Sequence, residues 1–160
     1  MRSDDLDRSL PSLFSELVFG APATGAFVLN RGDRGLLASL DALSADEASR
    51  VTGATSVAAH VRHLQYGLSL MNRWADGENP FRDANWAAAW EHPTVSPSAW
   101  ADLRASLAET CRAWHASLGS DRQVSGIELD GVLGSIIHLA YHLGAMRQMN
   151  GTLRGPSAND

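Results

Sequence analysis

The sequence predicts an all-α fold, an up-and-down four-helix bundle with short extra helical turns. Three observations favour it. Apolar residues recur at steps of three and four along several long segments, and no segment alternates apolar and polar residues as a half-buried strand does. Two pairs of histidines also fall on two different predicted helices, where they are expected to face one another across the interior.

The composition is that of one ordinary globular domain. The 160 residues are 44% hydrophobic and 19% charged, so one core suffices, and we expect a single domain over residues 1–150 with a flexible tail over 151–160. A net charge of -5 without a Lys/Arg cluster argues against nucleic acid as a partner. The absence of a signal-like or membrane-spanning apolar run, together with the lone Cys111, predicts a cytoplasmic protein without a membrane partner.

The first third of the chain predicts one helix followed by short helical turns. The helix is expected from Pro11 to Gly20, with room for an extension toward the N-terminus, because apolar residues repeat there at helical spacing. Four glycines and a proline then indicate a loop over residues 20–35. Leucines restart the helical pattern, and Ser44 with Glu47 has the spacing of a capping box.

Two long helices are predicted in the middle of the chain. The first spans residues 57–75, with Thr55 or Ser56 as its cap, because its apolar residues alternate in steps of four and three. The second spans residues 97–118, and its start is marked by Ser96 directly before a proline. Glycines follow both helices and fit their ends.

The last predicted helix spans residues 128–149 and is the most apolar of all. Between Asp130 and Arg147 it contains no Asp, Glu, Lys or Arg. A helix that is apolar on nearly every face is typically buried. We therefore expect it at the centre of the fold.

Two histidine pairs are the main functional clue. His60 and His63 lie three residues apart on one predicted helix, and His138 and His142 lie four apart on the last one. Residues at these spacings share a helix face with Cβ atoms about 5–6 Å apart, so both rings of a pair can converge on one ion. The small residue Gly134 beside the second pair leaves space for an ion and a ligand. The alternative is that these are core histidines bonded to carbonyls and hydroxyls.

The stretches SVAAHVRHL and IIHLAYHLGAMRQ resemble the DinB/YfiT-like superfamily of metalloenzymes, and the resemblance covers most of the chain. It implies that His63, His138 and His142 hold one divalent metal ion inside a four-helix bundle. Imidazole suits Zn, Ni, Cu and Fe alike, and zinc or nickel is expected first. His60 is expected to be an alternate ligand or to orient a ligand. Many members have Gln directly after the last glycine of the motif, whereas this chain has Ala145.

The resemblance also implies a metal-dependent enzyme that acts on a small-molecule substrate. Similar proteins include transferases that use a low-molecular-weight thiol such as bacillithiol or mycothiol, thiol-dependent isomerases and proposed hydrolases. The sequence shows no Ser/His/Asp arrangement, and Cys111 falls in a core stripe, so the protein offers no evident nucleophile of its own. The leading hypothesis is therefore an S-transferase that uses an external small thiol as the nucleophile. The alternatives are a metal-dependent hydrolase and a non-enzymatic, stress-associated binding or dimerisation bundle. A homodimer is also expected, from the resemblance and from surplus apolar helical surface.

The remaining candidates have weaker patterns. Cys111 and His115 lie four apart on one predicted helix, but the cysteine fits a buried small hydrophobe. Residues 77–97 predict an ordered loop in which Trp86 and Trp90 share one face, over either the metal pocket or the end of the bundle. Three further loop residues are expected to be solvated: Asp83, Glu91 and His92.

Overall fold

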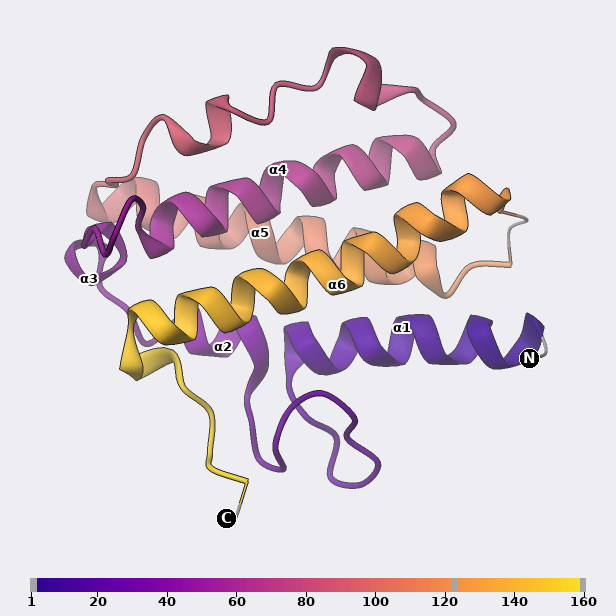
Figure 1. Ribbon diagram of the computed structural model, residues 1–160, viewed down its shortest axis with the longest axis horizontal. Coiled ribbons are helices and arrows are strands. Elements are labelled where there is room, and N and C mark those ends of the chain that lie inside the picture. The colour runs from indigo at the N-terminus through magenta and orange to yellow at the C-terminus, as the bar shows by residue number, and fades with distance from the viewer. Residues whose placement is uncertain (1–2, 122–123, 159–160) are drawn as a thin grey trace.

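The structure is a computed structural model that describes residues 3–121 and 124–158, and within these ranges it is all-helical (Figure 1). Four of its α-helices are long, and the rest of the described chain adds short helices, 3-10 turns and loops. The long helices are α1 (Ser3–Phe19), α4 (Val57–Ala75), α5 (Pro97–Leu118) and α6 (Gly126–Met149). The short elements are α2 (Gly35–Leu40), α3 (Ala45–Ser49), η1 (Pro80–Asp83), η2 (Ala88–Trp90) and η3 (Gly151–Leu153).

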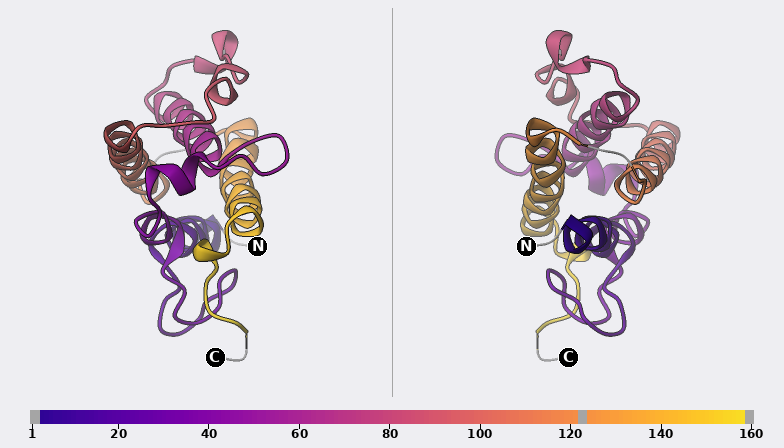
Figure 2. Two further views of the ribbon diagram at one scale, coloured as in Figure 1. Left: turned by 90° about the vertical axis from the view of Figure 1, so that its left-hand side faces the viewer. Right: turned by 90° about the vertical axis from the view of Figure 1, so that its right-hand side faces the viewer.

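The four long helices lie side by side, with their axes along the length of the molecule (Figures 1 and 2). Helices α1 and α6 run in one direction, and α4 and α5 run in the opposite direction (Figure 1). The expected strict up-and-down alternation is therefore wrong. Residues 76–96 return along α4 before α5 begins, so these two consecutive helices are parallel.

Helix α1 begins at Ser3, well before the predicted start at Pro11, which lies inside the helix. The apolar stripe explains the extension, since Leu10 is buried and Leu6 packs against the same core as Phe14. The helix ends at Phe19 and is followed by Gly20, whose φ of +115° favours glycine. A Cβ at this position would also lie 2.7 Å from the carbonyl oxygen of Asp33.

Local capping signals set the other helix starts. Ser56 caps α4 and Ser96 caps α5, each by accepting a backbone N–H bond, and Ser44 forms the predicted capping box with Glu47. Helix α6 begins two residues earlier than predicted. A second capping box, between Ser125 and Glu128, fixes that start.

One continuous hydrophobic core lies between the long helices, but α6 is not at its centre as predicted. Val132, Leu139 and Leu143 of α6 are buried, whereas Ile137 and Tyr141 are 67% and 68% exposed. Absence of charge did not imply burial here, because the other long helices contact only part of its surface. The large side chains buried most completely are Phe14, Leu36, Leu64, Leu107, Trp114, Leu139 and Met146.

The loop after α1 is organised by a buried carboxylate. Glu16 accepts hydrogen bonds from the backbone N–H groups of Phe27, Val28 and Leu29, at 2.6–3.2 Å. Beside this loop, Arg147 donates a 2.8 Å bond to the buried carboxylate of Asp33, which also accepts from a backbone N–H. Both carboxylates are therefore buried with donors of their own.

The segment expected to be a flexible tail starts with structure. Asn150 caps the 3-10 turn η3, and Leu153 within that turn is buried in the core. The sequence did not predict this turn, in which Leu153 is an apolar anchor among small polar residues. Residues 159–160 lie outside the described part of the chain. None of the described helices is both long and apolar enough to cross a membrane.

Candidate metal centre

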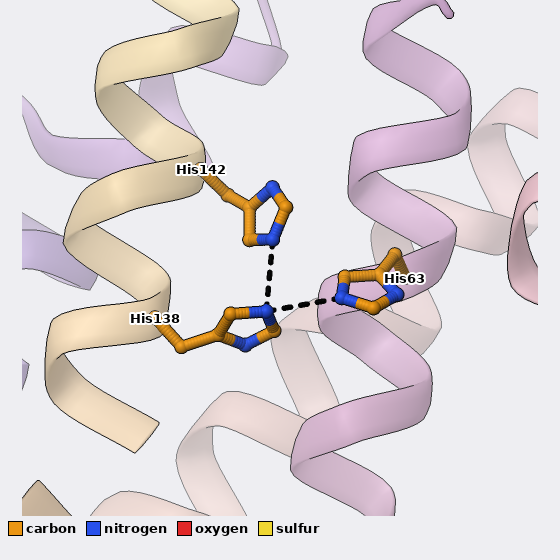
Figure 3. A group of neighbouring side chains, drawn as sticks. All are labelled: His63, His138 and His142. Carbon is orange, nitrogen blue, oxygen red and sulfur yellow. Dashed lines mark hydrogen bonds between the residues drawn. The ribbon is translucent and has the colours of Figure 1, made fainter. Parts of the chain in front are cut away.

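Four histidines meet where α4 and α6 pack against each other. His60 and His63 share one face of α4, and His138 and His142 share one face of α6. The two helices are antiparallel (Figure 1), so His63 lies beside His138 (Figure 3) and His60 lies beside His142. The sequence spacing thus predicted that the two pairs meet. Which rings touch depends on the register of α4 against α6.

Three of the rings point their Nε2 atoms at one another (Figure 3). Nε2 of His138 lies 3.0 Å from Nε2 of His63 and 2.8 Å from Nε2 of His142. Ligand atoms of these three histidines all lie within 4.8 Å of one another, an arrangement that can hold a metal ion. These are the three residues that the family resemblance implied as ligands.

Hydrogen bonding alone does not satisfy this cluster. A neutral imidazole nitrogen is either an N–H donor or a lone-pair acceptor. Nε2 of His138 faces two other nitrogens and therefore cannot complete a full hydrogen bond to both. Nδ1 of His63 is buried with no hydrogen-bond partner among the described residues. A cation among the three facing lone pairs would engage all three Nε2 atoms.

The spacing of the rings fits a small divalent cation. Zinc binds imidazole nitrogens at about 2.0–2.1 Å, and tetrahedral geometry then places two ligand nitrogens about 3.3 Å apart. The observed separations of 2.8 and 3.0 Å differ from this by a few tenths of an ångström. Small ring displacements are therefore enough to accept an ion.

Burial keeps the imidazoles neutral. Burial, with a smaller effect of neighbouring imidazoles, lowers the pKa of His63 to about 4 and that of His142 to about 3. Burial also lowers the pKa values of His60 and His138. Neutral imidazole is the form that binds metals, so the ligands are in the binding form at neutral pH.

His60 contacts the cluster through one of the proposed ligands. Its Nδ1 lies 2.7 Å from Nδ1 of His142, on the side of that ring away from His138. Ligating histidines typically use their second ring nitrogen for a hydrogen bond that fixes the tautomer and the ring orientation. Of the two expected roles for His60, this contact matches the orientation of a ligand.

Two tryptophans of the loop cover the histidines. Trp90 lies with its ring centroid 4.5 Å from that of His63 and 5.2 Å from that of His60, and Trp86 lies 5.6 Å from His63. Of the two predicted placements, the one over the metal pocket is therefore observed. The loop is held in place by Tyr66 of α4, whose hydroxyl accepts a 2.9 Å bond from the backbone N–H of Asn85.

An apolar cavity of about 450 Å³ opens beside His63 and His138. It lies between α4, α6 and the loop, and its wall includes Gly67, Phe81 and Gly134. Sequence reasoning anticipated space at Gly134 and, as one of two alternatives, a place for Trp86 over the pocket, but it did not anticipate Phe81 of the loop as part of the wall. The sequence signal for this wall is the cluster of aromatic residues in a segment whose other residues are typical of a solvent-exposed loop.

The weaker candidates lie elsewhere. Burial raises the pKa of the Cys111 thiol to about 12, and His115 packs against Phe14 and Phe19 rather than forming a ligand set. Asp83 is exposed and pairs with Arg82. The side chains of Glu91 and His92 are exposed, as expected.

Comparisons with known proteins add no relative, since no family model, curated protein or solved structure matches the chain.

Proposed function

We propose that this chain is a metal-dependent enzyme of the DinB/YfiT-like type, a four-helix bundle that holds one divalent ion on His63, His138 and His142. The observation that carries the proposal is the convergence of three neutral Nε2 atoms that cannot satisfy one another by hydrogen bonding. Zinc or nickel fits three imidazole ligands. When bound, the ion supplies a Lewis acid that lowers the pKa of a thiol or water in its open coordination position.

The reaction class that we favour is transfer to the sulfur of a small thiol. The chain's one cysteine is buried and its thiol pKa is about 12, so the protein offers no thiolate of its own. Bacillithiol or mycothiol would supply the sulfur. In the transfer, a carbon–sulfur bond forms, the bond from that carbon to its leaving group breaks with the electron pair on the leaving group, and the thiol proton passes to solvent.

The surrounding residues would position the reactants and exclude water. The ring of Trp90 covers the imidazoles from the side of the loop, and His60 holds His142 through the nitrogen that faces away from the cluster. Three neutral ligands also leave the charge of the ion uncompensated, which favours an anionic sulfur over a neutral donor.

Two other functions would use the same residues. A metal-dependent hydrolase needs the same ligands and the same open position, with water in place of the thiol. A non-enzymatic binding bundle would use the cavity without a reaction. Metal content and activity separate these functions.

The test starts with protein purified without a His-tag or a nickel column, analysed for bound elements and then loaded with zinc or nickel. Conjugation of a generic electrophile would be measured with bacillithiol, mycothiol and glutathione, next to hydrolysis of model esters. We expect conjugation in the parent and in His92→Ala, an exposed loop histidine, and its loss in His142→Ala. Ester cleavage without conjugation would favour the hydrolase. Inactivity despite full metal loading would favour the binding bundle.

We also propose that two copies of the chain associate through the outer face of α6. Ile137, Tyr141 and Ile127 are each more than two thirds exposed on this helix, and burying these apolar side chains against a second copy would be favourable. Light scattering at tens of micromolar should report a dimer for the parent chain and a monomer for Ile137→Asp. A monomeric parent would refute the association.

A further inference from the structure

The cavity beside the histidines is apolar except at one end. His63 and His138 present their imidazoles there, and the remaining wall is formed by aliphatic, aromatic and glycine residues. Ser135 is an exception, and it is the only other polar side chain that the described part of the chain places in the wall. Its hydroxyl accepts a 3.0 Å bond from the indole N–H of Trp114 and donates a 2.7 Å bond to the carbonyl of Val132.

No charged side chain lines the cavity among the described residues. A charged group placed inside would lose its hydration without gaining a partner, which is costly. An apolar group placed there would gain roughly 0.8 kcal/mol per buried methylene, or about fourfold in affinity. The wall therefore selects uncharged, apolar groups.

Glycines on both helices shape the wall, since two of them admit a tryptophan ring close to the helix backbone and a third borders open space. A Cβ at Gly67 of α4 would lie 3.2 Å from the ring of Trp86, and a Cβ at Gly131 of α6 would clash with the ring of Trp74. A Cβ at Gly134 would meet no atom within 4 Å, so this glycine borders the open part of the cavity. The volume of about 450 Å³ is typical of sites for small organic molecules.

We propose that this cavity binds the uncharged aryl or alkyl group of a small molecule whose polar end reaches the histidine cluster. The assignment of a substrate rests on the proposed transferase function. In that reaction, the apolar group in the cavity belongs to the electrophilic substrate. A thiol that carries carboxylates or sugars finds no cation in the wall, and its polar part stays outside. The substrate class is thus an apolar electrophile, with its reactive carbon next to His63 and His138.

The first test uses metal-free protein and N-phenyl-1-naphthylamine, an uncharged aromatic probe that fluoresces when it leaves water. We expect saturable binding to the parent and at least tenfold weaker binding to Gly134→Leu, whose side chain would occupy the cavity. Gly144→Leu is the matched control, because Gly144 is an exposed glycine of the same helix, outside the cavity, with equal space for a Cβ. Thermal unfolding would confirm that both variants are folded.

A second variant covers the case in which Gly134→Leu does not fold. Trp86 is 39% exposed and forms part of the wall, so Trp86→Ala removes apolar surface from the cavity without emptying the core. It should weaken binding of the probe severalfold. Binding that is unchanged in the folded variants would overturn the assignment, as would equal binding of an anionic, sulfonated naphthylamine.

The second test adds zinc and a series of alkyl hydroxamates, whose head group binds metals. Affinity should rise about fourfold per added methylene in the parent and stay flat in Gly134→Leu. A flat series in the zinc-loaded parent would overturn the assignment. If the amine probe depends on Gly134 but no metal binds, the cavity stands and the proposed metal-dependent function fails. If metal binds but neither the amine probe nor the hydroxamate series depends on Gly134, the metal-dependent function stands and the cavity assignment fails.

Discussion

Two of the buried polar clusters in the molecule have opposite character. The carboxylate of Glu16 accepts hydrogen bonds from three consecutive backbone N–H groups, and these bonds hold the loop after α1 in place. Around His138, three imidazole nitrogens face one another with too few donors and acceptors to match. Both clusters are buried, yet only the first is satisfied by the protein itself.

The pKa values of the two clusters reflect the same difference. For Glu16, burial raises the pKa, but hydrogen bonds from the three backbone amides lower it overall, so the charged form is the stable one. For His63 and His142, burial lowers the pKa, so the neutral form is the stable one. A polar group that is buried and satisfied supports the fold, whereas neutral lone pairs that converge without partners are suited to bind a cation.

Removing a proposed ligand should sharpen this contrast most. In His138→Ala, we expect zinc affinity to fall more than about 100-fold, because one of three ligands is lost. The free energy of unfolding of the metal-free protein should change by less than about 1 kcal/mol, because the ring is poorly satisfied in the first place. Chelator competition and urea unfolding would measure the two quantities. Unchanged zinc affinity would refute the ligand assignment.

Removing the satisfied carboxylate should have the opposite outcome. We expect Glu16→Ala to lower the free energy of unfolding by about 2–3 kcal/mol, because three backbone N–H groups lose their acceptor. Zinc affinity should stay within about twofold of the parent. Asp5→Ala is the matched control, since Asp5 is an exposed carboxylate of the same helix whose ion pair with Arg8 contributes at most about 1 kcal/mol. Equal losses in both variants would contradict the structural role of Glu16.

Altering the ring that orients a ligand should have a smaller effect. We expect His60→Ala to weaken zinc binding about 10- to 100-fold, because His142 loses the partner of its Nδ1 atom. His60→Gln, which restores a hydrogen-bonding group, should recover part of the affinity. His115→Ala serves as a control histidine on α5. A loss of stability without any change in zinc affinity would assign His60 to packing alone.

The smallest effect concerns pH. The folded state keeps His63 and His142 neutral, whereas an unfolded chain protonates them below its ordinary pKa of 6.5. The unfolded state therefore binds more protons, and metal-free protein should lose about 1 kcal/mol between pH 7 and pH 6 and more toward pH 4. Urea unfolding of the parent and of the double variant His63→Leu, His142→Leu would test this. A variant with the same slope would contradict the assignment of these protons.

Local signals in the sequence predicted much of the fold and the meeting of the two histidine pairs, whereas the choice of His63 over His60 as a ligand came from the family resemblance. The caps at Ser56 and Ser96 and the spacing of His138 and His142 depend on residues within one or two turns, so they can be read without knowledge of tertiary packing. The role of Glu16 could not be predicted in this way, because its partners lie 11–13 residues away in a loop.

The remaining errors concern tertiary packing. The exposure of Ile137, the burial of Leu153 and the direction of α5 depend on which elements cover which others. No pattern within a single helix contains that information. The full extent of the cavity was not predicted for the same reason, since its wall combines two helices with a loop.

The parallel course of α4 and α5 has a consequence for how freely the chain can vary. Helix α4 has 19 residues and is therefore about 28 Å long, a distance that roughly nine extended residues could span. The connection over residues 76–96 is more than twice that long, and the surplus forms the turns that place Trp86 and Trp90 over the histidines. Insertions, deletions and substitutions in this surplus can reshape what the cavity admits while the four long helices stay in place, which makes the connection a natural starting point for altering selectivity.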